Sequence, residues 1–248
     1  MNNIKELETY AREIGLLNPD GSLDRQYKYW KIASTWKANE MINLIRQIEH
    51  EKFHSVLEVG CGYGMILQEI SKYFDIHQVV GIDNHELTLK MAKKISPNCT
   101  YIVMDAYNLS FPNDSFDLVV LSDIIEHLEH PELLLKEARR VSKYSILKIP
   151  LEKCLRNIGR EYGIQDSSGH MFSLGETSAI NLITRTGFKI LNKSTAYPPD
   201  KLGGKERFKR FKFIAPLPRF IAKFLQNNIP TVYEWIFGKN LFIFCKNK

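Results

Sequence analysis

The sequence predicts an α/β fold in which a doubly wound, mostly parallel sheet carries helices on both faces. The first observation is residues 56–64 (VLEVGCGYG), where a short apolar strand runs into three glycines at alternate positions and a helical pattern follows. The second is that further apolar stretches alternate with helical patterns along the chain. The third is that two of these stretches lead into an acid, Asp83 and Asp105. Open α/β sheets bind ligands at the carboxyl ends of their strands, so we expect a ligand site at that edge of the sheet.

The glycine turn predicts a nucleotide-like cofactor. Gly60 and Gly62 allow bare backbone to approach a ligand, and the helix that follows aims its N-terminus at the same place. A dinucleotide fingerprint would have its third small residue at position 65, where Met65 stands, but here the glycine comes one position earlier, at Gly64. Glu58 is expected inside the buried strand, where a carboxyl group is costly unless it is paired or faces a polar ligand.

The stretches that follow fit a nucleotide-binding sheet. Residues 79–83 form the second expected strand, and its terminal acid is where α/β nucleotide folds bind the ribose hydroxyls. A third expected strand, residues 101–104, is followed by Asp105-Ala106. The later expected strands are residues 117–121, 145–150 and 241–245, and between them lie SDIIEHLEHPELLLKEARRVSK and GHMFSLGETSAINLITRTGF.

Together these motifs resemble those of the class I S-adenosylmethionine-dependent methyltransferases, in particular the type 11-like small-molecule enzymes. The resemblance covers residues 50–195 and the last strand. It implies a Rossmann-like sheet of seven strands in which the last strand is antiparallel. It also implies S-adenosyl-L-methionine as the cofactor and methyl transfer as the activity.

The resemblance further implies a set of cofactor-binding residues. Gly60 and Gly62 would let the backbone approach the cofactor, Asp83 would bind the ribose hydroxyls, and Asp105 would lie at the adenine. Cys61 is interpreted as a small spacer in the turn and not as a nucleophile. The full expected set is Glu58, Gly60, Cys61, Gly62, Gly64, Asp83, Asn84, Asp105, Ala106 and Ser122. Each residue alone also has a structural interpretation, as part of a tight turn or as a helix cap.

Methyl transfer to a hydroxyl benefits from a general base. His127, just after the fourth expected strand, is the best-placed candidate and His170 is the second, although either also fits a structural role. Some relatives carry an acid-x-x-Glu-His tract and a later His that hold a divalent metal. The matching residues here are Asp123, Glu126, His127 and His170. Because Asp123 stands where the stronger version has Glu, we predict no metal and leave metal binding as the alternative.

Length and composition favour a single domain with appendages. The chain has 248 residues, of which 44% are hydrophobic and 25% charged, enough for one large core. We expect a helical N-terminal extension at 1–50, the cofactor-binding core at 51–195, a helical basic insertion at 196–239 and the last strand at 240–248. The four cysteines show neither metal-site spacing nor the density of a disulfide framework. With no signal peptide or long apolar run, we expect a cytoplasmic protein.

Aromatic residues gather in the N-terminal extension, in residues 24–36 (DRQYKYWKIASTW). They lie between two stretches of helical periodicity. Relatives use such an extension as a lid over cofactor and acceptor. The alternative is that these aromatics pack the helices onto the sheet.

The basic excess is confined to the C-terminal fifth of the chain. Residues 200–248 contain eleven Lys or Arg and three acids, a balance of +8, and since the whole chain is +6, residues 1–199 are at −2. The composition of 196–239 fits contact with anionic lipid, an anionic acceptor or nucleic acid, and a solvated basic face is the structural alternative. We expect peripheral contact with the inner face of the membrane through 200–225. Prolines 216, 218 and 230 exclude one long helix.

Three classes of function stay open. We favour an enzyme that methylates a hydroxyl of a small or carrier-linked acceptor, such as a lipid, glycan or quinone-like compound, with an anionic group suggested by the basic insertion. A nucleic-acid methyltransferase is disfavoured, because there is no recognised RNA-binding module and residues 121–124 (LSDI) stand where an Asn/Asp-Pro-Pro-Tyr/Phe motif would lie. A non-catalytic scaffold is disfavoured by the intact glycine turn with Asp83 and Asp105.

Overall fold

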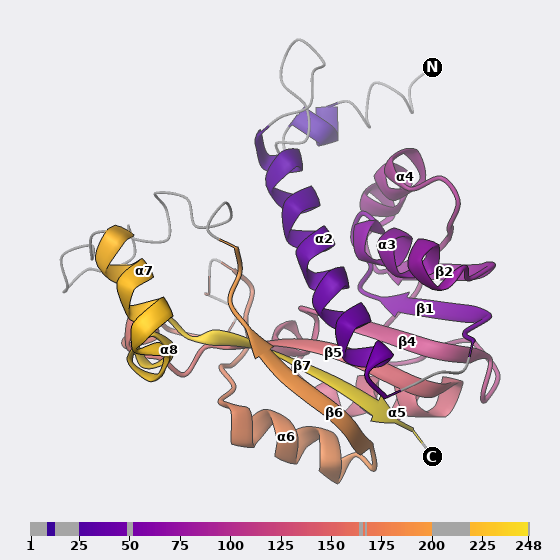
Figure 1. The fold of residues 1–248 in the computed structure, drawn as a ribbon. Coiled ribbons are helices and arrows are strands. Elements are labelled where there is room, and N and C mark those ends of the chain that lie inside the picture. Colours follow the sequence, from indigo (N-terminus) through magenta and orange to yellow (C-terminus); the bar gives the residue numbers. More distant parts are fainter. Residues whose placement is uncertain are drawn as a thin grey trace.

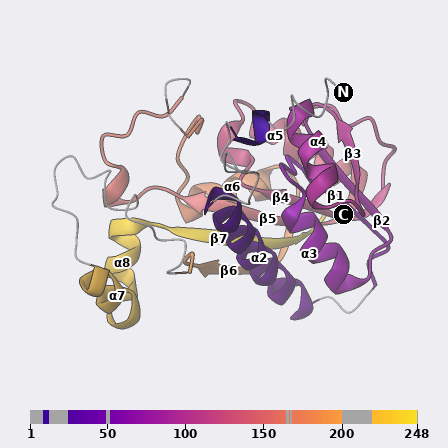
Figure 2. The same cartoon turned by 90° about the horizontal axis from the view of Figure 1, so that it is seen from above.

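A single seven-stranded sheet forms the centre of this computed structural model, which describes residues 9–12, 25–48, 52–163, 166, 168–199 and 219–247. The strands are β1 (Ser55–Val59), β2 (Gln78–Asp83), β3 (Thr100–Val103), β4 (Phe116–Ser122), β5 (Ser142–Leu151), β6 (Lys189–Ala196) and β7 (Lys239–Lys246). Their order is β3-β2-β1-β4-β5-β7-β6 (Figures 1 and 2). Strands β1 to β5 pair in parallel, and β7 is antiparallel to both of its neighbours. The expected fold class is therefore confirmed.

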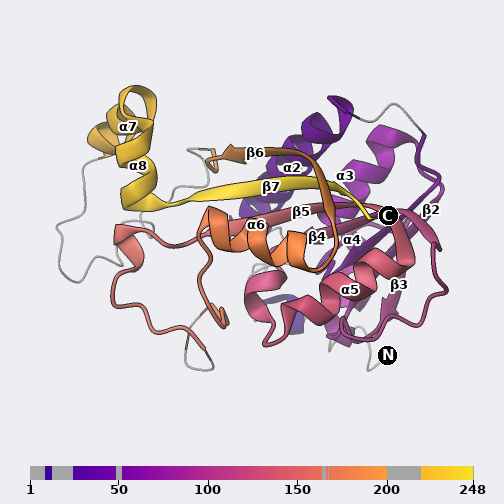
Figure 3. The same cartoon turned by 90° about the horizontal axis from the view of Figure 1, so that it is seen from below.

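Helices cover both faces of this sheet. The helices of the described chain include α2 (Arg25–Arg46), α3 (Met65–Phe74), α4 (Glu86–Ile95), α5 (Pro131–Val141), α6 (Glu176–Arg185), α7 (Arg219–Asn228) and α8 (Pro230–Phe237), with short 3₁₀ turns η1 (Ile125–His127) and η2 (Leu155–Asn157). Apolar residues of α2 and α3 share one core with the sheet, while α5 and α6 enclose a second core on the opposite face (Figures 2 and 3). Two cores on one sheet are the arrangement that a doubly wound chain requires.

The apolar pattern of each element explains its place. All five residues of β1 are buried, as expected for a strand in the middle of a sheet with both faces covered. Helices α5 and α8 begin with Pro131 and Pro230, which occupy the first helical turn, where proline fits. The helical insertion is interrupted between α7 and α8 at Pro230, as the sequence predicts.

The N-terminal extension is helical where the structure describes it. Residues 9–12 are helical, and α2 is one helix that includes the aromatic stretch. The aromatic residues from Tyr27 to Trp36 therefore belong to the same helix as the apolar residues from Met41 to Ile45, instead of forming a connection before it. Residues 1–8 and 13–24 lie outside the described residues. Since α2 packs against α3 and against the sheet, α2 is part of the core.

Helices α7 and α8 lie beyond the end of the sheet, away from β1 to β3 in all three views (Figures 1–3). They precede β7, whose first residue pairs with the last residue of β5. The expected basic insertion is thus helical at 219–237, whereas residues 200–218, with Lys209, Arg210 and Lys212, lie outside the described residues. No described helix combines the length and the apolar character needed to span a bilayer.

Candidate cofactor and acceptor site

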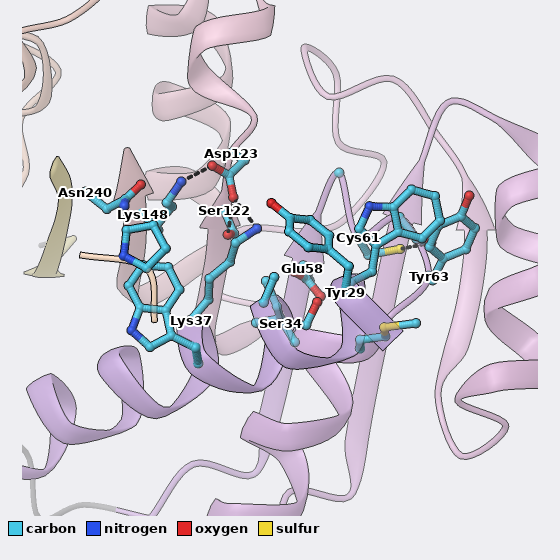
Figure 4. A pocket seen from close by; sticks show the side chains of 18 residues that line it. Tyr29, Ser34, Lys37, Glu58, Cys61, Tyr63, Ser122, Asp123, Lys148 and Asn240 are labelled. Atoms are coloured by element: carbon cyan, nitrogen blue, oxygen red, sulfur yellow. Dashed lines mark hydrogen bonds and ion pairs between the residues drawn. The ribbon is translucent and has the colours of Figure 1, made fainter. Parts of the chain in front are cut away.

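A cavity of about 460 Å³ opens at the carboxyl edge of the sheet. Its floor is the end of β1 with the glycine turn, and its walls come from α2 and from the ends of β4 and β5 (Figure 4). Five of the expected cofactor residues line it, namely Glu58, Gly60, Cys61, Gly62 and Ser122. The topology of the sheet places all of them at one edge, because β1, β4 and β5 run in parallel.

Other expected residues lie beside the cavity at the same edge. Asp83 ends β2, Asn84 follows it and is exposed, and Asp105 and Ala106 follow β3. Asp105 is exposed, and its Oδ1 accepts a hydrogen bond from the backbone N–H of Tyr107 at 2.9 Å. Asp83 and Asp105 therefore lie along the carboxyl edge of the sheet, between the cavity and the outer strand β3.

Asp83 links the second strand to the glycine turn. Its Oδ2 accepts the backbone N–H of Gly62 at 3.0 Å, and its Oδ1 accepts the N–H of His85 at 3.1 Å. A carboxylate has about four lone-pair positions, so two remain for hydroxyl groups of a ligand. The backbone N–H of Cys61 donates to Ile82 at 2.9 Å, which holds the turn against β2.

Two glycines in the turn serve different purposes. Gly62 has φ +52°, a conformation that favours glycine, and a Cβ added there would meet no atom within 4 Å. Gly64 has φ +67°, and its Cβ would meet the hydroxyl oxygen of Tyr101 at 2.0 Å. Backbone conformation thus explains both glycines, packing is a second reason for Gly64, and the backbone at Gly62 stays open to the cavity. The open backbone at Gly62, beside Asp83, fits the nucleotide-like cofactor that the sequence predicts.

Glu58 is buried, with 2% of its surface exposed, at the cavity floor. Its Oε2 accepts the backbone N–H of Leu67 at 3.1 Å in the helix that follows the turn. Burial raises the pKa of Glu58 to about 8, and this hydrogen bond and the charge of Lys37 reduce the effect. The carboxyl group is therefore mostly protonated at neutral pH while the cavity holds no additional cation.

Cys61 also lines the cavity but is not an activated thiol. Burial raises the pKa of this thiol far above its usual range, and the charges of Glu58 and Asp83 add to the increase. A nucleophilic cysteine requires the opposite shift, towards the thiolate. The interpretation of Cys61 as a spacer agrees with this environment.

One wall of the cavity is an ion-pair cluster of Lys37, Asp123 and Lys148, which was not predicted from the sequence. Lys37 on α2 reaches Asp123 at 2.6 Å, and Lys148 on β5 is paired with the other oxygen of the same carboxylate (Figure 4). Burial alone would raise the pKa of Asp123, but the charges of Lys148 and Lys37 hold it well below its usual range. The side chain of Lys148 is only 5% exposed. A lysine in the middle of an apolar strand (SILKIP) was the available signal.

Aromatic residues of α2 contribute to both the cavity and the core. Tyr29, Trp30 and Trp36 line the cavity. The ring of Trp30 lies 5.1 Å from that of Tyr63 in the glycine turn, and Trp36 meets Phe242 of β7 edge-on at 5.7 Å. The packing interpretation thus holds for Trp36, whereas a lid over cofactor and acceptor stays a prediction for the aromatics that line the cavity.

His127 and His170 lie together, outside the set of residues that line the cavity. Their rings are 4.7 Å apart, and with Glu126 they form a group whose possible ligand atoms all lie within 4.8 Å of one another. Nδ1 of His127 lies 3.1 Å from the carbonyl oxygen of Gly169. Burial and the neighbouring His170 lower the pKa of His127, which favours its neutral form.

Glu126 is buried, and neither of its carboxyl oxygens has a hydrogen-bond partner among the described residues. Burial, together with the charge of Asp123, raises its pKa to about 7. The four-residue set considered for a metal is only partly assembled, because Asp123 pairs with the two lysines. The remaining donors, two imidazoles and one carboxylate, are a chemically suitable set for a divalent metal.

A second ion-pair network fixes the loop after β5. Nδ1 of His170 lies 2.7 Å from Oε2 of Glu152, and Arg160 binds both Glu152 at 2.8 Å and Asp166 at 2.5 Å. These partners hold the pKa of Asp166 at about 2, with the hydrogen bond from Arg160 as the main cause. The network fixes the imidazole of His170, whose ring lies beside that of His127.

The fold is α/β, and its cavity lies at the carboxyl edge of the sheet, where such folds bind their ligands. Residues 57–145 match the family model described as a methyltransferase domain. An uncharacterised methyltransferase of Schizosaccharomyces pombe is 30% identical over 125 residues, which is 45% of this chain and 45% of that protein. A ubiquinone biosynthesis O-methyltransferase of Coxiella burnetii is 28% identical over 129 residues, 48% of this chain and 54% of that protein.

The magnesium protoporphyrin IX methyltransferase of Synechocystis, solved with bound SAH, has the same fold, with a TM-score of 0.60 at 13% identity over 98% of this chain and 95% of that one. Residues 57–145 are thus a methyltransferase domain, and the fold is that of the class I S-adenosylmethionine-dependent methyltransferases. For this domain, the family, the enzyme class and the cofactor expected from the sequence are confirmed. The chain spans about half the length of the curated relatives it matches.

Proposed function

We propose that the whole protein transfers the methyl group of S-adenosylmethionine to a hydroxyl of a small or carrier-linked acceptor. The observation that carries this proposal is one continuous cavity with the glycine turn at one end and the ends of β5 and β7 at the other. Such a cavity could hold the cofactor against the glycine turn and the acceptor beside it, against the polar and aromatic side chains of α2, β5 and β7. Its 460 Å³ lies within the range of small-molecule sites.

The cofactor supplies a methyl group that is already activated on a sulfonium, so the protein mainly has to position the reactants. Holding the acceptor oxygen in line with the methyl group is worth about 7 to 11 kcal/mol in well-oriented systems. The buried floor at Glu58 and the aromatic side chains of Tyr29, Trp30 and Trp36 in the cavity lining support this role, because such walls reduce the contact of bound reactants with water.

His127 is the proposed general base for removal of the hydroxyl proton. Its lowered pKa leaves the imidazole neutral near pH 7, which is the form that accepts a proton. In this structure it lies beside the cavity and not on its wall, so the acceptor would have to extend from the cavity towards η1. The similarity to a ubiquinone biosynthesis O-methyltransferase favours a quinone-like hydroxyl among the proposed acceptors.

A peripheral membrane contact is proposed for the α7–α8 hairpin in a cytoplasmic protein. Phe220, Phe224 and Trp235 are 74%, 57% and 65% exposed, and they are joined by exposed Ile229, between the two helices, and exposed Val232 on α8. Residues 200–225, which lead into and include most of α7, contain eight Lys or Arg and two acids. Exposed aromatics beside a basic segment are typical of contact with an anionic lipid surface.

The experiment that tests the proposed function is a screen for methyl acceptors. Purified protein is incubated with S-adenosylmethionine labelled in the methyl group and with fractionated lipid, glycan and quinone extracts. We expect label in a small or carrier-linked product with an ether linkage. Label only in RNA, or only on nitrogen or carbon, would contradict the proposal.

A further inference from the structure

The cavity has a half that the cofactor residues do not occupy. Across the sheet, Asp105, Asp83 and the glycine turn follow β3, β2 and β1, so the cofactor belongs to that side. The other side is formed by Lys148 of β5, Asn240 of β7 and the residues that follow β6. On the proposed function, this second half is where the acceptor lies.

Two lysines face one carboxylate in this half. Lys37 and Lys148 share Asp123, and no other direct ion-pair partner of either lysine is found among the described residues. Glu58 and Glu126 lie near the lysines, but burial raises the pKa of both and favours their neutral forms. Each ammonium group has three donors, so its ion pair with Asp123 leaves donors for a ligand. A buried cation without a matching anion is costly, and an added anion would reduce that cost.

Aromatic rings form part of the remaining walls. Trp36 precedes Lys37 on α2 and lines the cavity. Trp30, Tyr29 and Pro198 also line it, and Tyr29 and Lys37 are labelled in Figure 4. Flat apolar walls next to two cations match a ligand with an aromatic or otherwise apolar body and one anionic end. Asn240 adds an amide at the same end.

We propose that Lys37 and Lys148 bind an anionic group of the methyl acceptor, a carboxylate or a phosphate, and that Asp123 is the internal counter-ion with which this group shares the two lysines. This inference rests on the proposed function and names the class of its substrate. Asp123 has φ +53°, a backbone conformation that few residues other than glycine adopt, so its carboxylate is held at this position at a local cost.

The test uses the full chain saturated with S-adenosylhomocysteine and a matched pair of probes, benzoate and benzamide, with phenyl phosphate as a second anion. Calorimetry measures the dissociation constant of each probe. We expect benzoate to bind at least about tenfold more tightly than benzamide, since one charge-assisted hydrogen bond accounts for that ratio. The comparison of benzoate with phenyl phosphate identifies which anion the site prefers.

Substitutions separate the lysines from the rest of the cavity. Lys148→Met and Lys37→Met should each weaken benzoate binding at least about tenfold, whereas Asp123→Asn should strengthen it, because the lysines lose their internal competitor. Lys143→Met is the matched control: it lies on the same strand and is also paired with an aspartate, but its side chain is 57% exposed at the opposite end of the strand. It should leave benzoate binding unchanged.

The outcomes distinguish this inference from the proposed function. If the wild-type protein does not bind S-adenosylhomocysteine, the proposed function itself fails. If it binds S-adenosylhomocysteine while benzoate and benzamide bind equally or not at all, only the acceptor inference is overturned. It is also overturned if Lys37→Met and Lys148→Met weaken S-adenosylhomocysteine and leave benzoate unaffected, because the lysines would then serve the cofactor carboxylate. Thermal unfolding of each variant shows whether it is folded.

Discussion

The backbone N–H of Gly62 donates to the carboxylate of Asp83 at 3.0 Å, so the turn after β1 and the end of β2 form one unit. The same carboxylate also orders His85 at the start of the next helix. A cofactor bound at the turn would therefore meet a carboxylate whose position is already set. Preorganisation of this kind lowers the cost of binding.

Asp83→Asn should weaken binding of S-adenosylhomocysteine by roughly 10- to 150-fold, because a hydrogen bond to a charged acceptor is worth about 1.5 to 3 kcal/mol. Asparagine keeps one oxygen for Gly62, so the fold should be retained. Titration calorimetry measures the affinity. Asp75→Asn, at the exposed end of α3 where φ is +54°, is the matched control and should bind as the wild type does. Equal affinity of Asp83→Asn and wild type would remove Asp83 from the cofactor site.

His127→Ala should lower turnover by about 10² to 10⁴, the usual contribution of a general base, and leave cofactor affinity nearly unchanged. The assay uses the acceptor found by the labelled screen. His77→Ala, at an exposed position, is the control. A parallel fall of turnover and cofactor affinity would show that His127 belongs to the cofactor site or to the core.

The role of His127 as a base is separated from a role as a metal ligand by chelation. As a base, it should support the same turnover after treatment with EDTA. Loss of turnover that Mg²⁺ or another divalent ion restores would instead make Glu126, His127 and His170 a metal site, in line with their separation of at most 4.8 Å between ligand atoms.

Glu58 should make the cofactor-free protein less stable as the pH rises. Its pKa is about 8 in the folded protein and 4.5 without the fold, so the neutral form is favoured by folding. The stability it contributes is complete below pH 4.5 and is lost as the pH rises towards 8, at up to about 1.4 kcal/mol per pH unit. Glu126, with a raised pKa of about 7, acts in the same direction.

Glu58→Gln should therefore flatten the decrease in unfolding free energy between pH 5 and 8, as measured by urea denaturation. Glu86→Gln is the control, because Lys90 lowers the pKa of the exposed Glu86 and any effect of that pair falls below pH 4.5. The difference between each variant and the wild type also removes the contribution of His127, whose lowered pKa acts in the opposite direction. An unchanged slope in Glu58→Gln would contradict the assigned burial effect.

Replacement of Phe220, Phe224 and Trp235 by serine should weaken binding to anionic vesicles by at least about tenfold, since burial of one such side chain is worth about 1.5 to 3 kcal/mol. Co-sedimentation with anionic and neutral vesicles at two salt concentrations measures this. Tyr73→Ser, an aromatic that is 49% exposed on α3, is the control. Binding to RNA with no binding to vesicles would contradict the membrane contact and favour a nucleic-acid partner.

The parts of the fold that follow local patterns could be predicted from the sequence. The strand and glycine turn at 56–64 and the acids after β2 and β3 depend on short stretches of chain, and they appear where expected. The wall formed by Lys37 and Lys148 could not be predicted, because these residues are 111 positions apart and meet only when α2 packs across the sheet. Asp123 pairs with the two lysines and not with Glu126 and the histidines. The spacing of these residues in the sequence does not predict which partner Asp123 has.

The central claim, that the glycine turn and Asp83 form a site for S-adenosylmethionine, is tested most directly by titration calorimetry of the purified protein with S-adenosylhomocysteine and, separately, with NAD. The account predicts saturable binding of S-adenosylhomocysteine at one site per chain and weaker or no binding of NAD. Tighter binding of NAD than of S-adenosylhomocysteine would contradict it.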